Sequence, residues 1–190
     1  IDQELILKAK QKNIEFYQGE AIDVIKRIYL AARKKNFSNV FVCTGDNPLF
    51  DLSLAQKMIS HHLKKKSDFT CYSGAPLGSY GWVLKVKKIK KVLEVKKTKN
   101  TEIWGNLFLK NKNIRSSVLL RQNRNSMLSK IRLTVDTIED LKLVKEVLKI
   151  SKLKYPSLKN VEKILLDNKY LIKINSKIKQ RKAPRNVLFN

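Results

Sequence analysis

The sequence predicts an α/β fold in which helices cover both faces of a largely parallel sheet. Segments with helical spacing of apolar residues alternate with short continuous apolar runs, which are typical of strands covered on both faces. The chain has 190 residues, of which 43% are hydrophobic, and only 6 glycines and 4 prolines. This is long and apolar enough for one domain with a buried core, so we expect residues 1–190 to form a single domain.

In the first half of the chain, the two kinds of pattern follow one another closely. Ile22, Ile25 and Tyr29 recur at helical spacing, whereas residues 40–43 form a continuous apolar run. We expect, in order, a helix at 1–12, a strand at 13–17, a helix at 22–35, a strand at 40–43, a helix at 54–63 and a strand at 69–72.

The second half is less regular in its middle part. Ile138, Leu141, Val144 and Leu148 form the clearest amphipathic helix in the sequence. We expect, in order, a strand at 82–86, a short helix at 89–93, an irregular aromatic segment at 103–109, a strand at 131–135, a helix at 138–148, a helix at 158–165 and a basic tail.

The chain is strongly basic, with 41 Lys and Arg residues against 16 Asp and Glu residues and a formal net charge of +25. Clustered cations favour nucleic acid, but 33 of the 41 are lysine and they are spread over nearly every predicted helix. We therefore expect a solvated lysine-rich surface with no dedicated nucleic-acid interface. The charge can still attract an anionic small substrate.

Composition also bears on the compartment. No apolar run approaches the roughly 18 residues that span a bilayer, and no signal-like segment opens the chain. Cys43 and Cys71 lie far apart without a CxxC motif, and we expect Cys43 to pack inside a buried strand. His61 and His62 point to different faces of a helix and are expected to be surface or half-buried packing residues. We expect a cytoplasmic protein without membrane contact.

A first candidate site follows the apolar run 40–43. Gly45 permits a tight turn and close approach of the backbone, and Pro48 stiffens the exit, so Asp46 is expected at the rim of the sheet with its carboxylate free. The structural alternative is an Asx-turn, in which Asp46 bonds its own backbone. Asp51 is expected mainly as the N-cap of the next helix.

A second candidate site follows the apolar run 131–135. Thr137 and Asp140 resemble a capping box, which leaves Asp136 without a local structural role. Two carboxylates at the ends of neighbouring strands can share Mg²⁺, which prefers oxygen ligands and usually also contacts substrate phosphates. Acidic loop residues are common, so the residues alone leave this hypothesis open beside the structural one.

Several segments together resemble the cytidylyltransferase family, which contains the CMP-KDO synthetases. The likeness is greatest to the spore-coat polysaccharide biosynthesis protein F group and extends over nearly the whole chain. The segments are VFVCTGDNPLFD at 40–51, IRLTVDTIEDLKLV at 131–144, DVIKR at 23–27, GSYGWVLKV at 78–86, TEIWG at 101–105 and INSKIKQ at 174–180.

The resemblance implies a Rossmann-like nucleotidyltransferase of the nucleotide-diphospho-sugar transferase type, with three layers and a mixed, mostly parallel sheet. Such an enzyme transfers a nucleotide, usually CMP from CTP, to a sugar with release of pyrophosphate, uses Mg²⁺, and serves surface polysaccharide biosynthesis. Its expected partners are therefore CTP and a sugar. A homodimer is compatible with the resemblance, but the sequence does not predict the oligomeric state.

The resemblance also implies site residues. Asp46 and Asp136 match the aspartates that hold the metal and are catalytic. The resemblance further implies two groups of binding residues. Those expected to bind the nucleotide are Asp23, Arg27 and Gly45, and those expected to bind the sugar substrate are Tyr80, Glu102 and Trp104. From the residue types alone, Trp82 is expected in the core, and Trp104 is equally compatible with a core and a sugar-binding position.

The sequence departs from the family pattern at its start. Family members begin with a strand and a Gly-rich loop that carries Arg and Lys and binds the triphosphate, but residues 1–20 do not match this loop. The chain begins with Ile1, and we expect an N-terminally truncated domain that lacks a half-unit of about 50–60 residues.

Two other functions remain open at this point. One is a non-catalytic module that binds a nucleotide sugar or a polyanion through charge, which predicts binding that falls steeply with salt. The other is a Mg²⁺-dependent glycosyltransferase, although Asp46 is followed by Asn47 and Pro48 in place of a DxD-like acidic pair.

Overall fold

The structure, a computed structural model, describes residues 3–121, 128 and 131–180. Its centre is a four-stranded sheet of β1 (Asn39–Val42), β2 (Phe69–Ser73), β3 (Trp82–Lys85) and β4 (Ser116–Leu120), in the order β1-β3-β2-β4. β3 is antiparallel to both β1 and β2, and β2 is parallel to β4, so β1, β2 and β4 run in the same direction. The predicted α/β fold with a mixed sheet is confirmed.

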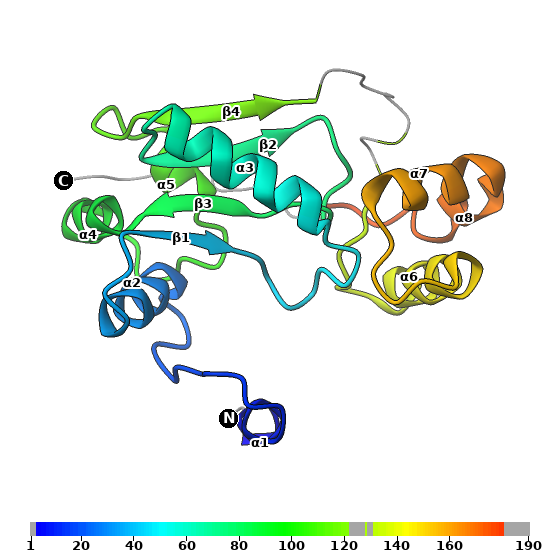
Figure 1. Cartoon of the computed structure of the whole chain (residues 1–190), viewed down its shortest axis with the longest axis horizontal. Coiled ribbons are helices and arrows are strands. Elements are labelled where there is room, and N and C mark those ends of the chain that lie inside the picture. Colours follow the sequence, from blue (N-terminus) through cyan, green and yellow to red (C-terminus); the bar gives the residue numbers. More distant parts are fainter. Residues whose placement is uncertain (1–2, 122–127, 129–130, 181–190) are drawn as a thin grey trace.

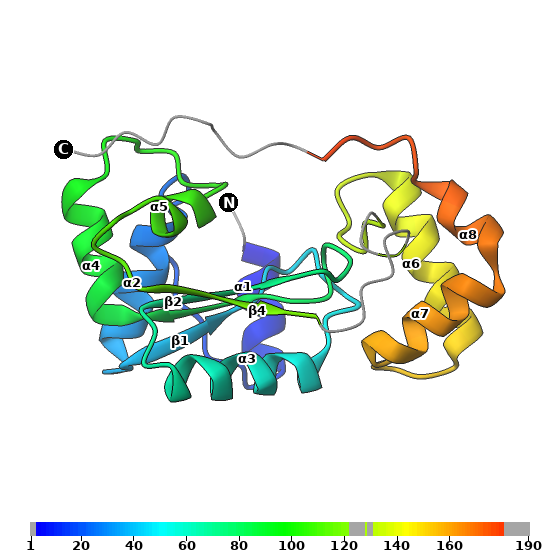
Figure 2. The same cartoon turned by 90° about the horizontal axis from the view of Figure 1, so that it is seen from above.

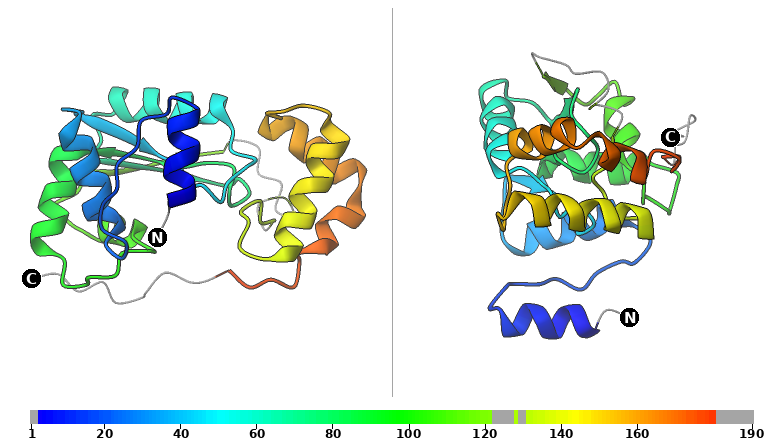
Figure 3. Two further views of the ribbon diagram at one scale, coloured as in Figure 1. Left: turned by 90° about the horizontal axis from the view of Figure 1, so that it is seen from below. Right: turned by 90° about the vertical axis from the view of Figure 1, so that its right-hand side faces the viewer.

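Helices cover both faces of this sheet, as Figures 1 and 2 show. α3 lies on one face, α2, α4 and α5 lie on the other, and α6, α7 and α8 pack together beyond one end of the sheet. α1 stands apart and is joined to α2 by an extended segment (Figure 3). The helices are α1 (Gln3–Gln11), α2 (Val24–Lys34), α3 (Leu52–Lys64), α4 (Val86–Val95), α5 (Gly105–Leu109), α6 (Ile138–Ser151), α7 (Leu158–Asp167) and α8 (Lys169–Ile174).

Alternating side chains of the strands form separate cores on the two faces. In β3, Val83 packs with Met58 under α3, whereas Leu84 packs with Phe69 and Phe108 on the opposite face. A third core joins the helices α6, α7 and α8 to the segment before α6, and it contains Leu133, Leu143, Val147, Leu165 and Leu171.

Side-chain caps begin the helices where the sequence predicted them. Asp51 caps α3 by accepting a hydrogen bond from the backbone N–H of Leu54 at 2.8 Å. Thr137 and Asp140 form the predicted capping box of α6. A second capping box, Ser157 with Asn160, begins α7. These caps satisfy backbone donors that have no partner within the helix.

Two predicted strands are absent from the described part of the chain. Residues 14–20 are extended but pair with no described strand, and residues 131–135 form only an isolated parallel bridge between Arg132 and Leu77. Conversely, β4, α5 and α8 were not predicted, and α5 lies within the segment 103–109 that was expected to be irregular. β4 begins with two serines and exposes Val118 and Leu120, so it lacks the continuous apolar run of a strand covered on both faces.

Two packing predictions need correction. Cys43 was expected inside a buried strand, but it follows the end of β1 and is exposed. His62 is only 1% exposed, because its ring lies between Thr70 and Asn39, at 2.8 Å and 3.2 Å from their side-chain oxygens. Burial lowers the pKa of His62 from its ordinary value.

Candidate functional site

The loop after β1 and the segment before α6 lie side by side. The backbone N–H of Val135 donates a hydrogen bond to the backbone carbonyl of Asp46 at 2.8 Å. A third segment joins them, because the N–H of Leu133 donates to the carbonyl of Leu77 at 2.7 Å. The two segments that carry Asp46 and Asp136 are therefore neighbours, as the strand-end argument required, although residues 131–135 are not a sheet strand.

Two glycines of the GSYG sequence allow this close packing. Gly78 has a φ of +96°, and a Cβ atom there would lie 2.5 Å from the backbone N of Thr134. A Cβ on Gly81 would overlap the backbone carbonyl of Val42 in β1. The segment 78–81 thus lies against the end of β1 and against the segment before α6, at two positions where only glycine fits.

Asp46 carries the most informative atom of the site. It is half-buried, and its Oδ1 is buried without any hydrogen-bond partner. The side-chain oxygen of Asn47 is in the same condition, while the Asn47 amide donates to the Thr44 hydroxyl at 2.9 Å. These are the two such side-chain atoms in the described part of the chain. Buried oxygens without donors are costly, and they are suitable ligands for a hard cation.

Asp136 differs from the prediction in one respect. Its side chain is 51% exposed, but it has a structural partner, because its Oδ2 accepts a hydrogen bond from Nη2 of Arg132. The sequence had left Asp136 without a local role. The contact was not foreseen because Arg132 stands within the apolar run 131–135, where the expected strand would have separated the two side chains.

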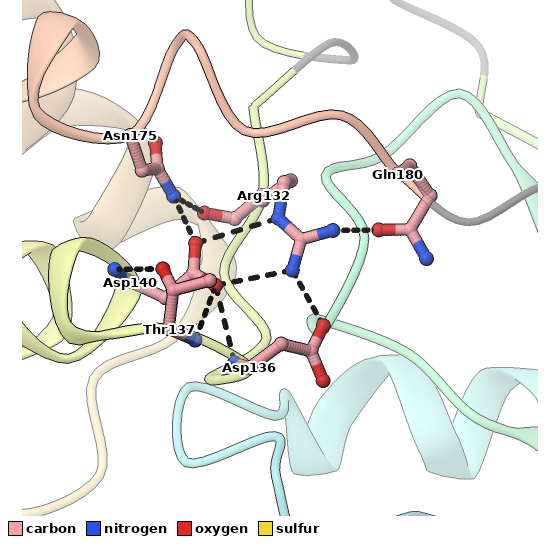
Figure 4. A network of polar contacts seen from close by, with 6 residues as sticks. All are labelled: Arg132, Asp136, Thr137, Asp140, Asn175 and Gln180. Carbon is pink, nitrogen blue, oxygen red and sulfur yellow. Dashed lines mark hydrogen bonds and ion pairs between the residues drawn. The ribbon is translucent and has the colours of Figure 1, made fainter.

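Arg132 is the centre of a buried polar network (Figure 4). Its Nη2 also donates to Oδ2 of Asp140 at 3.1 Å, and that same oxygen accepts from the backbone N–H groups of Asp136 and Thr137, each at 3.1 Å. Asp140 is 0% exposed. Burial opposes its ionisation, but the hydrogen bonds of Arg132 and Asn175 hold the pKa of Asp140 below its ordinary value.

The residues predicted to lie near the nucleotide have contacts within the chain. Asp23 caps α2, and it accepts from Lys96 at 2.7 Å and from Thr101 at 2.9 Å. Burial raises its pKa, but these hydrogen bonds hold the pKa of Asp23 below its ordinary value. Arg27 donates to the backbone carbonyl of Glu20 at 2.8 Å. Both oxygens of the Asp23 carboxylate are thus engaged at the start of α2.

The structure shows no tight turn that requires glycine at Gly45, and the predicted contact of Gly45 with a nucleotide stays a prediction. A Cβ atom at this position would meet nothing within 4 Å, and Gly45 is not among the glycines with positive φ. Neither a strained turn nor close packing within the described chain requires glycine there. Open space beside Asp46 is the property that Gly45 contributes.

The three residues predicted for the sugar pocket are not brought together. Trp104 is 4% exposed and packs against Trp82, with ring centroids 5.0 Å apart, so it is a core residue and not a platform for a sugar. Tyr80 packs with Tyr72 in the core under α3, on the opposite face of the sheet. Burial raises the pKa of Tyr80. Glu102 is exposed.

Comparison with known proteins identifies the fold. No family model matches the sequence. The chain is 26% identical over 181 residues to an uncharacterised protein of Methanocaldococcus jannaschii. The matched region covers 95% of this chain and 74% of that protein. A solved structure of a cytidylyltransferase from Leptospira borgpetersenii superposes with a TM-score of 0.82 at 22% identity, covering 90% of this chain and 74% of that chain.

This chain has the fold of that cytidylyltransferase. At 22% identity, the similarity concerns the arrangement of the helices and strands. In this cytidylyltransferase-like fold, the Asp46 loop follows the end of β1, and the Asp136 segment leads into α6. None of the helices in the described residues is long and apolar enough to cross a membrane.

Three further residues of the site were missed by the sequence reasoning: Arg132, Asn175 and Gln180. An arginine within an apolar run was the one local signal, because a buried guanidinium requires acceptors. Asn175 and Gln180 lie in the INSKIKQ segment that contributes to the resemblance, but their contacts with Arg132 span 43 and 48 residues of sequence and were not predicted.

Proposed function

We propose that this chain is a nucleotidyltransferase that transfers CMP from CTP to a sugar and releases pyrophosphate. One observation carries the proposal: the loops of Asp46 and Asp136 meet, and a buried oxygen of Asp46 lacks a partner. The similarity of the fold to a cytidylyltransferase supports the reaction class. The sugar and the role in surface polysaccharide biosynthesis rest on the resemblance of the sequence segments.

Asp46 and Asp136 are the residues proposed to hold Mg²⁺. Asp46 offers an unpartnered oxygen, and Asp136 is exposed at the end of the adjacent segment. A bound Mg²⁺ would neutralise negative charge on the triphosphate and orient the phosphate for attack by the sugar hydroxyl. The protein keeps the two loops in register through the Val135–Asp46 hydrogen bond, and the open space at Gly45 leaves room for a ligand beside Asp46.

The free edge of β1 supports the predicted additional strand and phosphate loop. Among the described strands, β1 pairs only with β3. A cavity of about 820 Å³ lies along its other edge, between residues 40–43 and the segment 13–17. An edge strand presents backbone donors and acceptors that a further strand can pair with. We propose that the Gly-rich loop would enter the site from this side.

Replacement of the two aspartates tests the proposal. We expect Asp46→Asn and Asp136→Asn each to reduce pyrophosphate release from CTP, measured over a panel of sugars with Mg²⁺, by more than about 100-fold, because loss of even an outer partner of a metal ligand commonly costs about 10–100-fold. Asp167→Asn is the matched control, since Asp167 is exposed at the end of α7. Full turnover in Asp46→Asn would contradict the proposal.

The net charge of +25 favours one second candidate, a module that binds polyanions or nucleotide sugars without catalysis. Such binding would fall steeply as salt rises and would not need Mg²⁺. A glycosyltransferase would instead release sugar from a nucleotide donor without forming pyrophosphate. The reaction product therefore distinguishes the three functions: pyrophosphate indicates a nucleotidyltransferase, sugar released from a nucleotide donor indicates a glycosyltransferase, and no product indicates a binding module.

A further inference from the structure

The segment that follows α8 returns to the candidate site, although the proposed function has not used it. Asn175 is 3% exposed, and its Nδ2 donates to the backbone carbonyl of Arg132 at 3.0 Å and to Oδ1 of Asp140 at 2.7 Å. Farther along, the side-chain oxygen of Gln180 accepts a hydrogen bond from Nη1 of Arg132 (Figure 4). Residues 175–180, which we call the C-terminal segment, thus contact Arg132 at both its backbone and its side chain.

Arg132 connects the C-terminal segment to Asp136. Its side chain is 8% exposed. Nη1 is bonded to Gln180, and Nε and Nη2 are bonded to the two oxygens of Asp140 at 3.4 Å and 3.1 Å. Nη2 also donates to Asp136. A guanidinium presents its donors in a rigid planar fork. The contacts of Arg132 with Asp140 and Gln180 therefore also fix the position of Nη2, the donor of the hydrogen bond that Asp136 accepts.

Asp140 gives the network a second connection to Asp136. Its Oδ2 accepts the backbone N–H groups of both Asp136 and Thr137. The backbone of Asp136 is thus held by Asp140, and its carboxylate is held by Arg132. Because the Asp136 side chain is 51% exposed, little else in the described chain packs around it to select one rotamer.

We propose that Arg132 is a positioning residue for the Asp136 carboxylate, and that Asn175 and Gln180 keep Arg132 in the required place. The proposal rests on the function proposed above, since it presumes that Asp136 binds a cation together with Asp46. One Asp136 oxygen is tethered to Arg132, so the carboxylate is oriented before the cation arrives. Pre-orientation of a ligand reduces the conformational entropy lost on binding.

The opposite role for Arg132 makes an opposite prediction. If its positive charge only competed with a cation for Asp136, loosening Arg132 would strengthen cation binding. If Arg132 positions Asp136, loosening it weakens cation binding. The direction of the change in affinity therefore decides between the two roles.

Gln180 is the most suitable position for the test, because it is exposed and its side chain bonds Arg132. Gln180→Met keeps the length of the side chain and removes the acceptor, whereas Gln180→Glu keeps an acceptor. Ser176→Ala is the matched control, since Ser176 is exposed in the same segment and, among the described residues, its hydroxyl bonds the backbone carbonyl of Lys173 in α8 and not Arg132. Binding of Mn²⁺ by the full chain with CTP is measured from the electron paramagnetic resonance signal of free Mn²⁺, relative to the same Mn²⁺ and CTP concentrations without protein, and Tm is recorded for each variant.

We expect Gln180→Met to weaken Mn²⁺ binding by about tenfold with unchanged Tm, as is common for outer partners of metal ligands. Gln180→Glu should bind at least as tightly as the wild type, and Ser176→Ala should match it. Equal or tighter binding by Gln180→Met would overturn the positioning role.

The same titration separates the two proposals. Wild-type protein that binds Mn²⁺ with CTP, and loses this binding in Asp46→Asn, retains the proposed function whatever the Gln180 variants do. Wild-type protein that binds no Mn²⁺ would overturn the proposed function, and the positioning role with it.

Discussion

A single buried carboxylate, that of Asp51, begins two helices from different parts of the fold. Asp51 is 5% exposed, and its Oδ1 accepts from the N–H of Leu54 in α3, while its Oδ2 accepts from the N–H of Leu158 in α7 at 2.5 Å. Burial raises its pKa, but these hydrogen bonds together hold the pKa of Asp51 below its ordinary value. The residue was predicted as the cap of one helix; its second contact depends on tertiary structure.

Asp51→Asn is expected to lower the free energy of unfolding by about 1–3 kcal/mol at pH 7, because the amide leaves one buried N–H without an acceptor. A lowered carboxyl pKa stabilises the fold above the unfolded value of about 4, and this stabilisation is lost as pH falls through the folded pKa. The difference between wild type and variant should therefore shrink below about pH 4. Urea unfolding of the wild type and Asp51→Asn, at pH 7 and below about pH 4, measures this difference. Equal stability of the two proteins at pH 7 would contradict the role of Asp51 as a cap of both helices.

The glycines provide a second prediction at this scale. Gly78→Ala places a Cβ against the backbone of Thr134 at a φ of +96°, so we expect a loss of about 1–3 kcal/mol in unfolding free energy. Gly105→Ala is the matched control, because nothing lies within 4 Å of its Cβ position. Denaturant unfolding of both variants provides the comparison. A Gly78→Ala protein as stable as Gly105→Ala would show that the segment does not pack this closely.

At the scale of helices and strands, the elements that could be predicted from the sequence are those that depend on a local pattern of residues and not on tertiary contacts. β1 and α6 were predicted because a continuous apolar run and an amphipathic pattern are visible in the sequence itself. The predicted strand at 131–135 is wrong. The side chain of Arg132 hydrogen-bonds within a buried polar network, and in the described chain the backbone of this segment forms only the single bridge between Arg132 and Leu77. Apolar character at 131–135 reflects packing against α6 and α7.

The candidate site shows the same division. Asp46 and Asp136 could be singled out because each follows an apolar run, a local pattern. The Arg132 network could not, because its partners Asn175 and Gln180 are more than 40 residues away. Trp104 was ambiguous because an indole suits both a core and a sugar platform, and only its contacts with Phe69 and Trp82 show that it is core.

At the scale of the whole molecule, side-chain hydrogen bonds join α7 of the helical group α6–α8 to the part of the fold that contains the sheet. Arg121, directly after β4, donates to both carboxylate oxygens of Glu162 in α7, and Asp51 bonds the start of the same helix. The candidate site lies where this group adjoins the end of the sheet, because Asp46 follows β1 and Asp136 precedes α6. The net charge of +25 makes a triphosphate a favourable ligand anywhere on this surface, so charge alone does not identify the site.

The central claim is that the Asp46 and Asp136 loops bind CTP together with a divalent cation. The most direct measurement is calorimetric titration of the full chain with CTP, with and without Mg²⁺, at two salt concentrations. The account predicts binding that requires Mg²⁺, changes little with salt and is lost in Asp46→Asn but kept in Asp167→Asn. Binding that ignores Mg²⁺, survives in Asp46→Asn and falls steeply with salt would contradict it, and would indicate a polyanion-binding surface.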